Sequence, residues 1–484
     1  MLKPLALFVS FLLLGQAADN VQQRLTGRAF GDTPILNDLH ELCDGIGGRP
    51  TGSPTCERAI EWAVAKFKAA GADTVETEAF TVPQQWTPRI ADAECVAPER
   101  FNLRLAAAPY SLSTTGSIEA PILDAGEGTP EAFEQLGARG RGAIALVASK
   151  EMKTLDDLFA EYMRSPAMLA AARKAGVAAL LLQSTRPHGL LYRHPLAMAN
   201  EPMALPAAVV SREQAGRLLR LAARGPVRVR LNLQNRSGGS YESRNVVAEI
   251  RGRERPAEVV LLGAHLDSWE LGTGAEDNGA NSAMVIEAAR AIHLLGQRPR
   301  RSIRFVLFTG EEQGMFGSAG YVQRHKMEME RHNAVVIFDM GSGRTTGFFL
   351  NGREDLRRPL NRALAGIAGL EAADNPIDAL DGTDNFDFLL SGVPNLVANQ
   401  EAAPYLPQYH AESDTVDRVN TRELRANSAI ANSLVWWLAE DPERFGRRLN
   451  RDEVDKLITD TKLDAQMKAF GQWDDYHAGK RGVR

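Results

Sequence analysis

The stretch from Val259 to Gly317 decides the fold, and it reads VVLLGAHLDSWELGTGAEDNGANSAMVIEAARAIHLLG and then QRPRRSIRFVLFTGEEQGMFG. Residues 259–263 and 302–309 are apolar runs with the length of a buried strand. A helical pattern separates the two runs. Strands that alternate with helices predict a mainly parallel sheet with helices on its faces.

Side chains of the kinds that bind metals follow each of the two predicted strands. His265 and Asp267 come after the first strand, and Glu311 and Glu312 come after the second. Asp277 stands where the intervening helix begins. Because α/β proteins form their sites at the carboxyl ends of parallel strands, we expect these side chains to lie close together. Hydrolytic metal sites need imidazole and carboxylate ligands and one further carboxylate as a base, so the stretch predicts such a site.

Each of these residues, taken alone, also has an ordinary structural explanation. Asp277 could be a plain helix cap, and two adjacent glutamates commonly form a solvated turn. Two later residues favour a metal site over these structural explanations. Asp339 ends an apolar run at 334–338, and His410 lies in the segment LPQYHAESDTVDRVN. A charge attached to a core strand is costly unless it is paired or bound to a metal. We therefore include Asp339 and His410 in the candidate site.

The charge balance of the candidate site favours metal ions. The four carboxylates of Asp277, Glu311, Glu312 and Asp339 would raise one another's pKa and become protonated if nothing compensated them. Two divalent cations would supply four positive charges, and no cluster of Lys or Arg is placed to do the same. Since the candidate ligands mix His with carboxylates and the chain has no CxxC spacing, the pattern favours two zinc ions.

Length and composition indicate a globular protein of more than one domain. The 484 residues exceed one ordinary core, so two or three domains are expected. Hydrophobic residues make up 44% and charged residues 24%, which excludes a disordered chain. The net charge is -5 and no block of Lys or Arg dominates, so we expect no nucleic-acid partner, and small or peptidic substrates remain open.

The first 18 residues have the pattern of a signal peptide. Lys3 gives a positive start, Leu5 to Leu14 is an apolar run, and small residues at 15–18 suit cleavage. We therefore expect a secreted or periplasmic protein with no transmembrane segment in the mature chain. The alternative is an uncleaved membrane anchor.

Cysteine is scarce in this sequence. The chain has three, Cys43, Cys56 and Cys95. Cys43 and Cys56 flank one loop and are the best candidates for a disulfide in a secreted protein. Three free thiols are an equal alternative.

The order of the predicted strands and helices along the chain indicates a domain that is interrupted by an insert. From about residue 111, short strand-like runs alternate with helical runs, and a Gly/Ser-rich loop at 235–245 marks their end. The predicted segments are the N-terminal part of the catalytic domain at 19–110, the insert at 111–237, the main part of the catalytic domain at 238–443 and a charged C-terminal helix and loose tail at 444–484. In the insert we expect helices at 130–136, 167–175 and 212–223. His188 and His194 lie in a Pro/Arg loop, and we expect both on the surface.

Three motifs together resemble the co-catalytic di-zinc exopeptidase family, which includes bacterial aminopeptidases and carboxypeptidase Q (plasma glutamate carboxypeptidase). They are AHLDSWELGTGAEDNGA at 264–280, RFVLFTGEEQGMFGS at 304–318 and YHAESDT at 409–415. The insert resembles a protease-associated domain, above all in ALPAAVVSREQAGRLL at 204–219. The resemblance implies an α/β fold: a mixed, mainly parallel sheet sandwiched by helices, as in phosphorylase/hydrolase-like zinc peptidases, with an inserted protease-associated α/β domain.

The resemblance also implies a role for each candidate residue. Two zinc ions would share the bridging ligand Asp277, and the full ligand set would be His265, Asp277, Glu312, Asp339 and His410. His265 and Asp339 would complete one zinc site, and Glu312 and His410 the other. Three further residues would serve catalysis: Glu311 as general base, Asp267 as the carboxylate that orients His265, and Tyr409 as a donor to the developing oxyanion. A cis peptide bond after Asp277 is also implied.

The expected activity is hydrolysis of terminal peptide bonds in short peptides or dipeptides by a metal-activated water. The enzyme would be an aminopeptidase or a dipeptidase like carboxypeptidase Q, and a homodimer is considered because such relatives are often dimers. Two alternatives stay open: a glutaminyl cyclase-like enzyme with a single zinc, and a non-catalytic homologue. His265 argues against the first, and the complete ligand set argues against the second. One departure is Asn385, which stands where many relatives have histidine.

Overall fold

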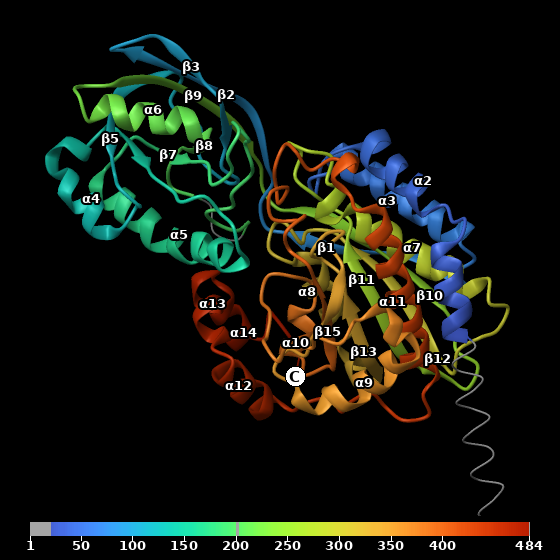
Figure 1. The fold of residues 1–484 in the computed structure, drawn as a ribbon. Helices are drawn as coiled ribbons and strands as arrows, with labels where there is room; N and C mark the ends of the chain where they lie inside the picture. The colour runs from blue at the N-terminus through green and yellow to red at the C-terminus, as the bar shows by residue number, and fades with distance from the viewer. Residues whose placement is uncertain (1–20, 200–202, 484) are drawn as a thin grey trace, which may run out of the picture.

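The computed structural model describes residues 21–199 and 203–483 (Figure 1). It contains one sheet of seven strands and one of eight, each accompanied by helices. The predicted signal peptide at 1–18 lies outside the described residues. Among the helices that the structure describes, none is both long enough and apolar enough to cross a membrane.

The seven-stranded sheet carries the stretch that holds most of the candidate site. Its strands, in spatial order, are β1 Thr74–Val82, β10 Tyr241–Ile250, β12 Arg301–Phe308, β11 Arg255–His265, β13 His332–Ile337, β15 Asn395–Gln400 and β14 Thr345–Phe349. The four strands β12, β11, β13 and β15 are parallel to one another, whereas β1, β10 and β14 are joined by antiparallel pairings. The sheet is therefore mixed with a parallel centre, which confirms the predicted mixed, mainly parallel sheet sandwiched by helices.

Helices cover both faces of this sheet. One face packs against α3 Pro54–Ala69, α7 Ala280–His293 and α11 Thr421–Glu440, and the other against α8 Phe316–Arg324 and α10 Phe386–Leu390. Val260 and Leu262 point into the first of these cores and Leu261 into the second, because successive strand residues face opposite ways. The shorter helical segments are α2 Ile35–His40, η1 Glu41–Ile46, η3 Ala275–Gly279, η4 Lys326–Arg331, η5 Glu354–Leu356, α9 Arg357–Leu364, η6 Ala365–Leu370 and η7 Val416–Arg418.

The eight-stranded sheet belongs to the insert. Its strands, in spatial order, are β3 Phe101–Leu103, β2 Trp86–Ala97, β9 Arg228–Ser237, β5 Ile118–Asp124, β6 Ile144–Val147, β7 Ala179–Gln183, β8 Ala207–Val210 and β4 Leu105–Ala107. Its helices are α4 Pro130–Leu136, η2 Gly137–Gly140, α5 Leu155–Ala175 and α6 Arg212–Ala222. Strands β2, β3 and β4 precede the predicted boundary at residue 111 but belong to this sheet. Strand β2 pairs along its length with β9, at the far end of the insert. We therefore propose residues 86–237 as the insert.

Helix α5 is longer than the sequence pattern indicated. It begins at Leu155 instead of residue 167, with a capping box between Thr154 and Asp157, and it continues through Pro166. A proline inside a helix removes a backbone hydrogen bond and usually ends the helix, so it concealed the first half. That first half carries side chains that reach the candidate site.

The C-terminal segment is packed against the larger domain, so the prediction of a loose tail was wrong. It forms α12 Arg451–Asp460, α13 Leu463–Ala469 and α14 Gln472–His477. Val454, Leu457 and Met467 are buried in one cluster with Phe386 and Leu390. The charged side chains of the segment lie mostly on its outer face, which is why composition alone indicated a solvated tail.

All three cysteines are buried free thiols. Of the two alternatives for Cys43 and Cys56, the free thiols are therefore the correct one. Cys43 Sγ lies 3.6 Å from the carbonyl oxygen of Gly274. Burial raises the pKa of Cys43 to about 12, so this thiol stays protonated.

Candidate metal centre

Three neighbouring parallel strands deliver the candidate residues to one edge of the larger sheet. Strand β11 lies between β12 and β13 and ends at His265. Glu311 and Glu312 follow the end of β12, and Asp339 follows the end of β13. Because the three strands run in the same direction, their carboxyl ends bring these side chains together.

The five predicted metal ligands form two triads that share Asp277. One triad is His265, Asp277 and Asp339, and the other is Asp277, Glu312 and His410; within each, the candidate ligand atoms lie within 4.8 Å of one another. His265 Nε2 is 3.1 Å from Asp277 Oδ1 and 2.9 Å from Asp339 Oδ1. His410 Nε2 is 3.5 Å from Asp277 Oδ2 and 2.8 Å from Glu312 Oε2. The two carboxylate oxygens of Asp277 therefore face different histidines.

A tight turn presents Asp277 to both histidines. The residue interrupts η3 with non-helical backbone angles, and its peptide bond to Asn278 is cis, as the resemblance implied. The carboxylate of Asp414 accepts hydrogen bonds from the backbone N–H groups of Ala275 (2.9 Å), Glu276 (2.6 Å) and Asp277 (3.2 Å). Asp414 thus fixes the turn, a contact that the sequence did not reveal because it joins segments far apart in the chain.

His265 takes its orientation from the main chain. Its Nδ1 lies 3.0 Å from the backbone oxygen of Asp267 and 3.7 Å from the Asp267 carboxylate. That carboxylate accepts a hydrogen bond from the Thr51 hydroxyl (2.7 Å), and Thr51 Oγ1 accepts one from the N–H of Gly310 (2.8 Å). A ligating histidine needs a fixed partner for its second ring nitrogen. In this structure the carbonyl of Asp267 is that partner, and Thr51 ties the loop after β11 to the loop after β12.

The insert holds the loop that carries His410. This residue has a φ of 56°, which is uncommon for a side chain other than glycine. Its Nδ1 donates to the carbonyl oxygen of Arg193 (3.0 Å), and the Arg193 N–H donates to the His410 carbonyl (3.0 Å). Tyr409 stacks on the His410 ring with the centroids 3.7 Å apart. The insert and the larger domain are therefore joined next to the candidate ligands.

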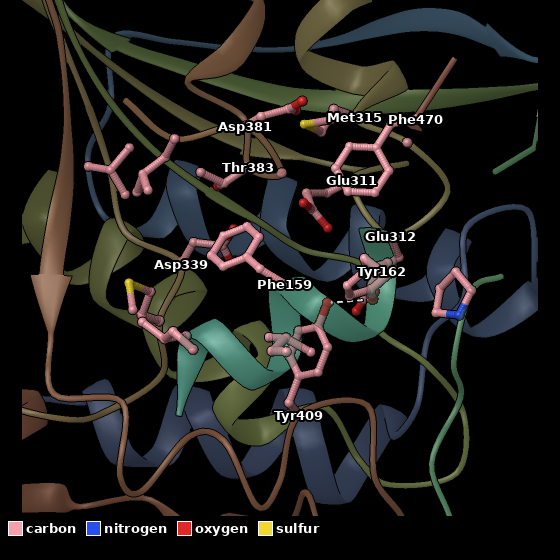
Figure 2. A pocket seen from close by; sticks show the side chains of 18 of the residues that line it. Phe159, Tyr162, Glu311, Glu312, Met315, Asp339, Asp381, Thr383, Tyr409 and Phe470 are labelled. Atoms are coloured by element: carbon pink, nitrogen blue, oxygen red, sulfur yellow. Dashed lines mark hydrogen bonds between the residues drawn. The ribbon is translucent and has the colours of Figure 1, made fainter. Parts of the chain in front are cut away.

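Tyr162 of α5 is a site residue that the sequence did not reveal. Its hydroxyl lies 2.8 Å from the hydroxyl of Tyr409, and Figure 2 shows the two hydroxyls facing each other in the pocket. Burial raises the pKa of both phenols well above the ordinary value, so both hydroxyls keep their protons. The contact brings together an insert helix and a loop of the larger domain.

The histidines of the Pro/Arg loop differ from each other. His188 is exposed, as predicted. His194 is buried, so the prediction for it was wrong; its ring lies 5.1 Å from that of Tyr162, and burial lowers its pKa to about 4. The loop turns inward because Glu161, itself buried, lies 3.8 Å from His194 and accepts a hydrogen bond from Tyr192.

Burial and mutual repulsion govern the charges of the site. Burial raises the pKa of Glu311 and Glu312, and neighbouring carboxylates raise it further. Burial opposes a charge on His265, yet the carboxylates around it, Asp339 foremost, hold its pKa well above the usual value. Asp277 Oδ2 and Glu312 Oε1 are buried without a hydrogen-bond partner. A divalent cation would satisfy these oxygens and offset the repulsion, so the donor set fits zinc.

Three of the five candidate ligands, Glu312, Asp339 and His410, line a pocket with a cavity volume of about 150 Å³ (Figure 2). Its other walls come from α5 of the insert, the loop at 380–383 and the C-terminal segment at 470–472. Among the described residues, the lining includes the carboxylates Glu311, Glu312, Asp339 and Asp381 but no Lys or Arg. The pocket thus combines carboxylates with largely apolar walls.

A comparison with protein families matches residues 245–435 to the model described as "Peptidase family M28". The match runs from β10 to α11. It contains all five candidate metal ligands and the predicted general base, and it leaves out the insert.

Individual relatives cover much more of the chain. Carboxypeptidase Q of Bos taurus is 29% identical over 411 residues, which are 84% of this chain and 85% of that protein. The "Probable lipoprotein aminopeptidase LpqL" of Mycobacterium tuberculosis is 27% identical and covers 88% of each chain. The crystal structure of a peptidase M28 precursor from Shewanella amazonensis has a TM-score of 0.80 at 28% identity and covers 90% of this chain and 99% of that one. A zinc aminopeptidase from Bacillus subtilis shares the fold, with a TM-score of 0.66 at 19% identity over 86% of this chain and 97% of that one.

Proposed function

We propose that the chain is a zinc peptidase of family M28 and, more specifically, an exopeptidase that releases the N-terminal residue of short peptides, dipeptides included. The observation that carries the proposal is the pair of triads that share Asp277. Each triad would hold one zinc ion, with Asp277 as the bridging ligand. Two-metal hydrolases use such a pair as a clamp on the attacking and leaving atoms.

Bound zinc would supply Lewis-acid chemistry here, because it lowers the pKa of a water and polarises the carbonyl of the scissile bond. Glu311 lines the pocket beside the ligands but belongs to neither triad. Its carboxylate is therefore left to take a proton from the attacking water and to give it to the leaving amine. His265 and His410 keep their orientation through the carbonyl oxygens of Asp267 and Arg193.

Two tyrosines serve the developing oxyanion. Tyr409 lies against His410, and its hydroxyl faces the pocket. Each hydroxyl has one proton to donate. If Tyr409 donates its proton to the oxyanion, Tyr162 must donate to Tyr409 across their 2.8 Å contact. Tyr162 then orients Tyr409 and strengthens its hydrogen bond to the substrate.

The charges of the pocket favour a free amine in it. The lining that the structure describes has four carboxylates and no Lys or Arg. Of these carboxylates, Asp381 lies outside both triads and is not needed as a base. A substrate α-carboxylate would meet no cationic side chain here, whereas an ammonium group beside Asp381 would lower the pKa of that carboxyl, which burial raises to about 7, and pair with its ionised form. This supports placing the N-terminal residue of the substrate in the pocket.

End-blocked dipeptides test the proposal. We expect the purified protein to hydrolyse a free dipeptide and its C-terminal amide, and to leave the N-acetyl dipeptide intact. Cleavage of the acetylated peptide without cleavage of the amide would contradict the proposed polarity and favour a carboxypeptidase. A chelator should abolish hydrolysis and zinc should restore it.

Two alternatives predict different results in the same assays. Full activity with one zinc ion per chain would favour a glutaminyl cyclase-like site. Absence of hydrolysis with every peptide, in protein that binds zinc, would favour a non-catalytic homologue. The presence of all five ligands in two triads supports the peptidase.

Three further proposals concern the context of the enzyme. We propose that residues 1–18 direct export to the periplasm or the medium, which N-terminal sequencing of the mature protein would test. We propose that the insert is a protease-associated domain that narrows access to the site. A homodimer stays a prediction, and light scattering of the purified protein would decide it.

A further inference from the structure

The C-terminal segment forms one wall of the substrate pocket. Phe470, between α13 and α14, and Gln472, the first residue of α14, both line it. Figure 1 shows α13 beside α5 of the insert, and the Phe470 ring meets the Tyr162 ring at 6.0 Å in an edge-to-face arrangement. Two segments far apart in the chain thus meet above the candidate ligands.

This wall is fixed to the larger domain by buried contacts. Arg481 forms an ion pair with Asp387 (2.7 Å) inside the protein and donates to the carbonyl oxygen of Gly314. The N–H of Gly482 donates to the same carboxylate (3.1 Å). Together with the apolar cluster under α12 and α13, these contacts fix the segment that carries Phe470. A side chain on a fixed segment can select among substrates, because its backbone cannot move aside without breaking buried contacts.

The wall is apolar and the space it bounds is small. Phe470 faces a lining that includes Leu158 and Phe159 of α5, Leu380 and Met315. A dry apolar cavity of about 150 Å³ accommodates a molecule the size of benzene. The pocket, with a volume of about 150 Å³, therefore has room for one bulky apolar side chain and not for an extended peptide.

We infer that Phe470 is a specificity-determining residue: with Phe159 it forms the surface that receives a bulky apolar side chain of the substrate, such as that of Leu or Phe. The inference rests on the proposed peptidase function. Phe470 touches neither triad and has no part in the chemical step. Its effect should therefore fall more on the kcat/KM of substrates with a bulky apolar side chain than on that of small substrates.

Dipeptides Leu-Ala, Phe-Ala and Ala-Ala test the inference through their kcat/KM values. The wild type should prefer Leu-Ala and Phe-Ala to Ala-Ala by about tenfold or more, the usual effect of filling an apolar pocket. In Phe470→Ala this preference should fall about tenfold, because kcat/KM should fall more for Leu-Ala and Phe-Ala than for Ala-Ala. Phe470→Trp, which narrows the same space, should shift the preference toward Ala-Ala. The matched control is Trp473→Ala, which removes a half-buried aromatic ring of α14 that does not line the pocket.

The outcomes separate this inference from the function on which it rests. If the wild type cleaves the dipeptides but Phe470→Ala and Phe470→Trp keep its preference, the inference is overturned and the peptidase function stands. The inference is also overturned if Trp473→Ala loses the preference to the same extent. If the wild type cleaves none of the dipeptides, the proposed function itself fails. Thermal unfolding and zinc content of each variant establish that it folds and binds metal.

Discussion

Replacing Tyr162 by phenylalanine removes one hydroxyl and keeps the ring that lines the pocket. The lost contact is the 2.8 Å hydrogen bond to Tyr409. A hydrogen bond between neutral groups contributes about 0.5–1.5 kcal/mol net, which corresponds to a loss of about 2- to 12-fold in kcat. KM should change little, because the apolar wall of the pocket is retained. Steady-state kinetics with a free dipeptide measure both constants.

A double-mutant cycle tests whether Tyr162 acts through Tyr409. Tyr409→Phe removes the proposed donor to the oxyanion and should cost about 10²–10³-fold in kcat. In that background Tyr162→Phe should cost nothing further, because its partner is gone. The control is Tyr476→Phe, which removes a tyrosine hydroxyl bonded to Asp455 (2.7 Å) in the C-terminal helices. Equal losses from Tyr162→Phe in both backgrounds, or no loss in either, would refute the reasoning.

The structure also predicts the outcomes of three other substitutions and of one control. Glu311→Gln should keep its zinc but lose about 10²–10⁴-fold in kcat, and near-normal turnover would exclude it as general base. Arg481→Met leaves Asp387 buried and unpaired, so urea titration should show a loss of about 3–5 kcal/mol in the free energy of unfolding. Arg447→Met removes an exposed ion pair and should cost much less, and equal losses from the two substitutions would contradict the account. Burial raises the pKa of Asp381 from 3.8 to about 7. Between pH 3.8 and pH 7 the carboxyl group is therefore protonated in the native state and ionised in the unfolded chain. The contribution of the Asp381 carboxyl to stability is complete below pH 3.8 and is lost as the pH rises through 7. The Tm of Asp381→Asn should therefore fall less between pH 4 and pH 8 than the Tm of the wild type. An equal fall in both proteins would contradict this prediction.

The larger domain could be predicted from local patterns because its strands are apolar on both faces. The runs at 259–263, 302–309 and 334–338 match β11, β12 and β13 closely. Such runs are typical of parallel strands that helices cover on both sides. The strands at one edge of the insert sheet were missed because their sequences lack such an apolar run. Strand β2 has no continuous apolar pattern and depends on its pairing with β9.

The candidate ligands could be predicted because neighbouring parallel strands must end at the same edge of a sheet. The contacts that orient the ligands could not. The bond between His410 and Arg193 and that between Tyr162 and Tyr409 each join the insert to the larger domain, and no local spacing indicates such pairs. The charged C-terminal segment likewise gave no sign that Phe470 reaches the pocket, because its packing depends on partners elsewhere in the fold.

Anomalous diffraction at the zinc edge, from crystals of zinc-loaded protein, tests the central claim most directly. We expect two peaks about 3.5–4 Å apart, one on each side of Asp277. One peak should lie between His265 and Asp339, and the other between Glu312 and His410. A single peak, or two peaks away from these side chains, would contradict the assignment of a two-zinc centre.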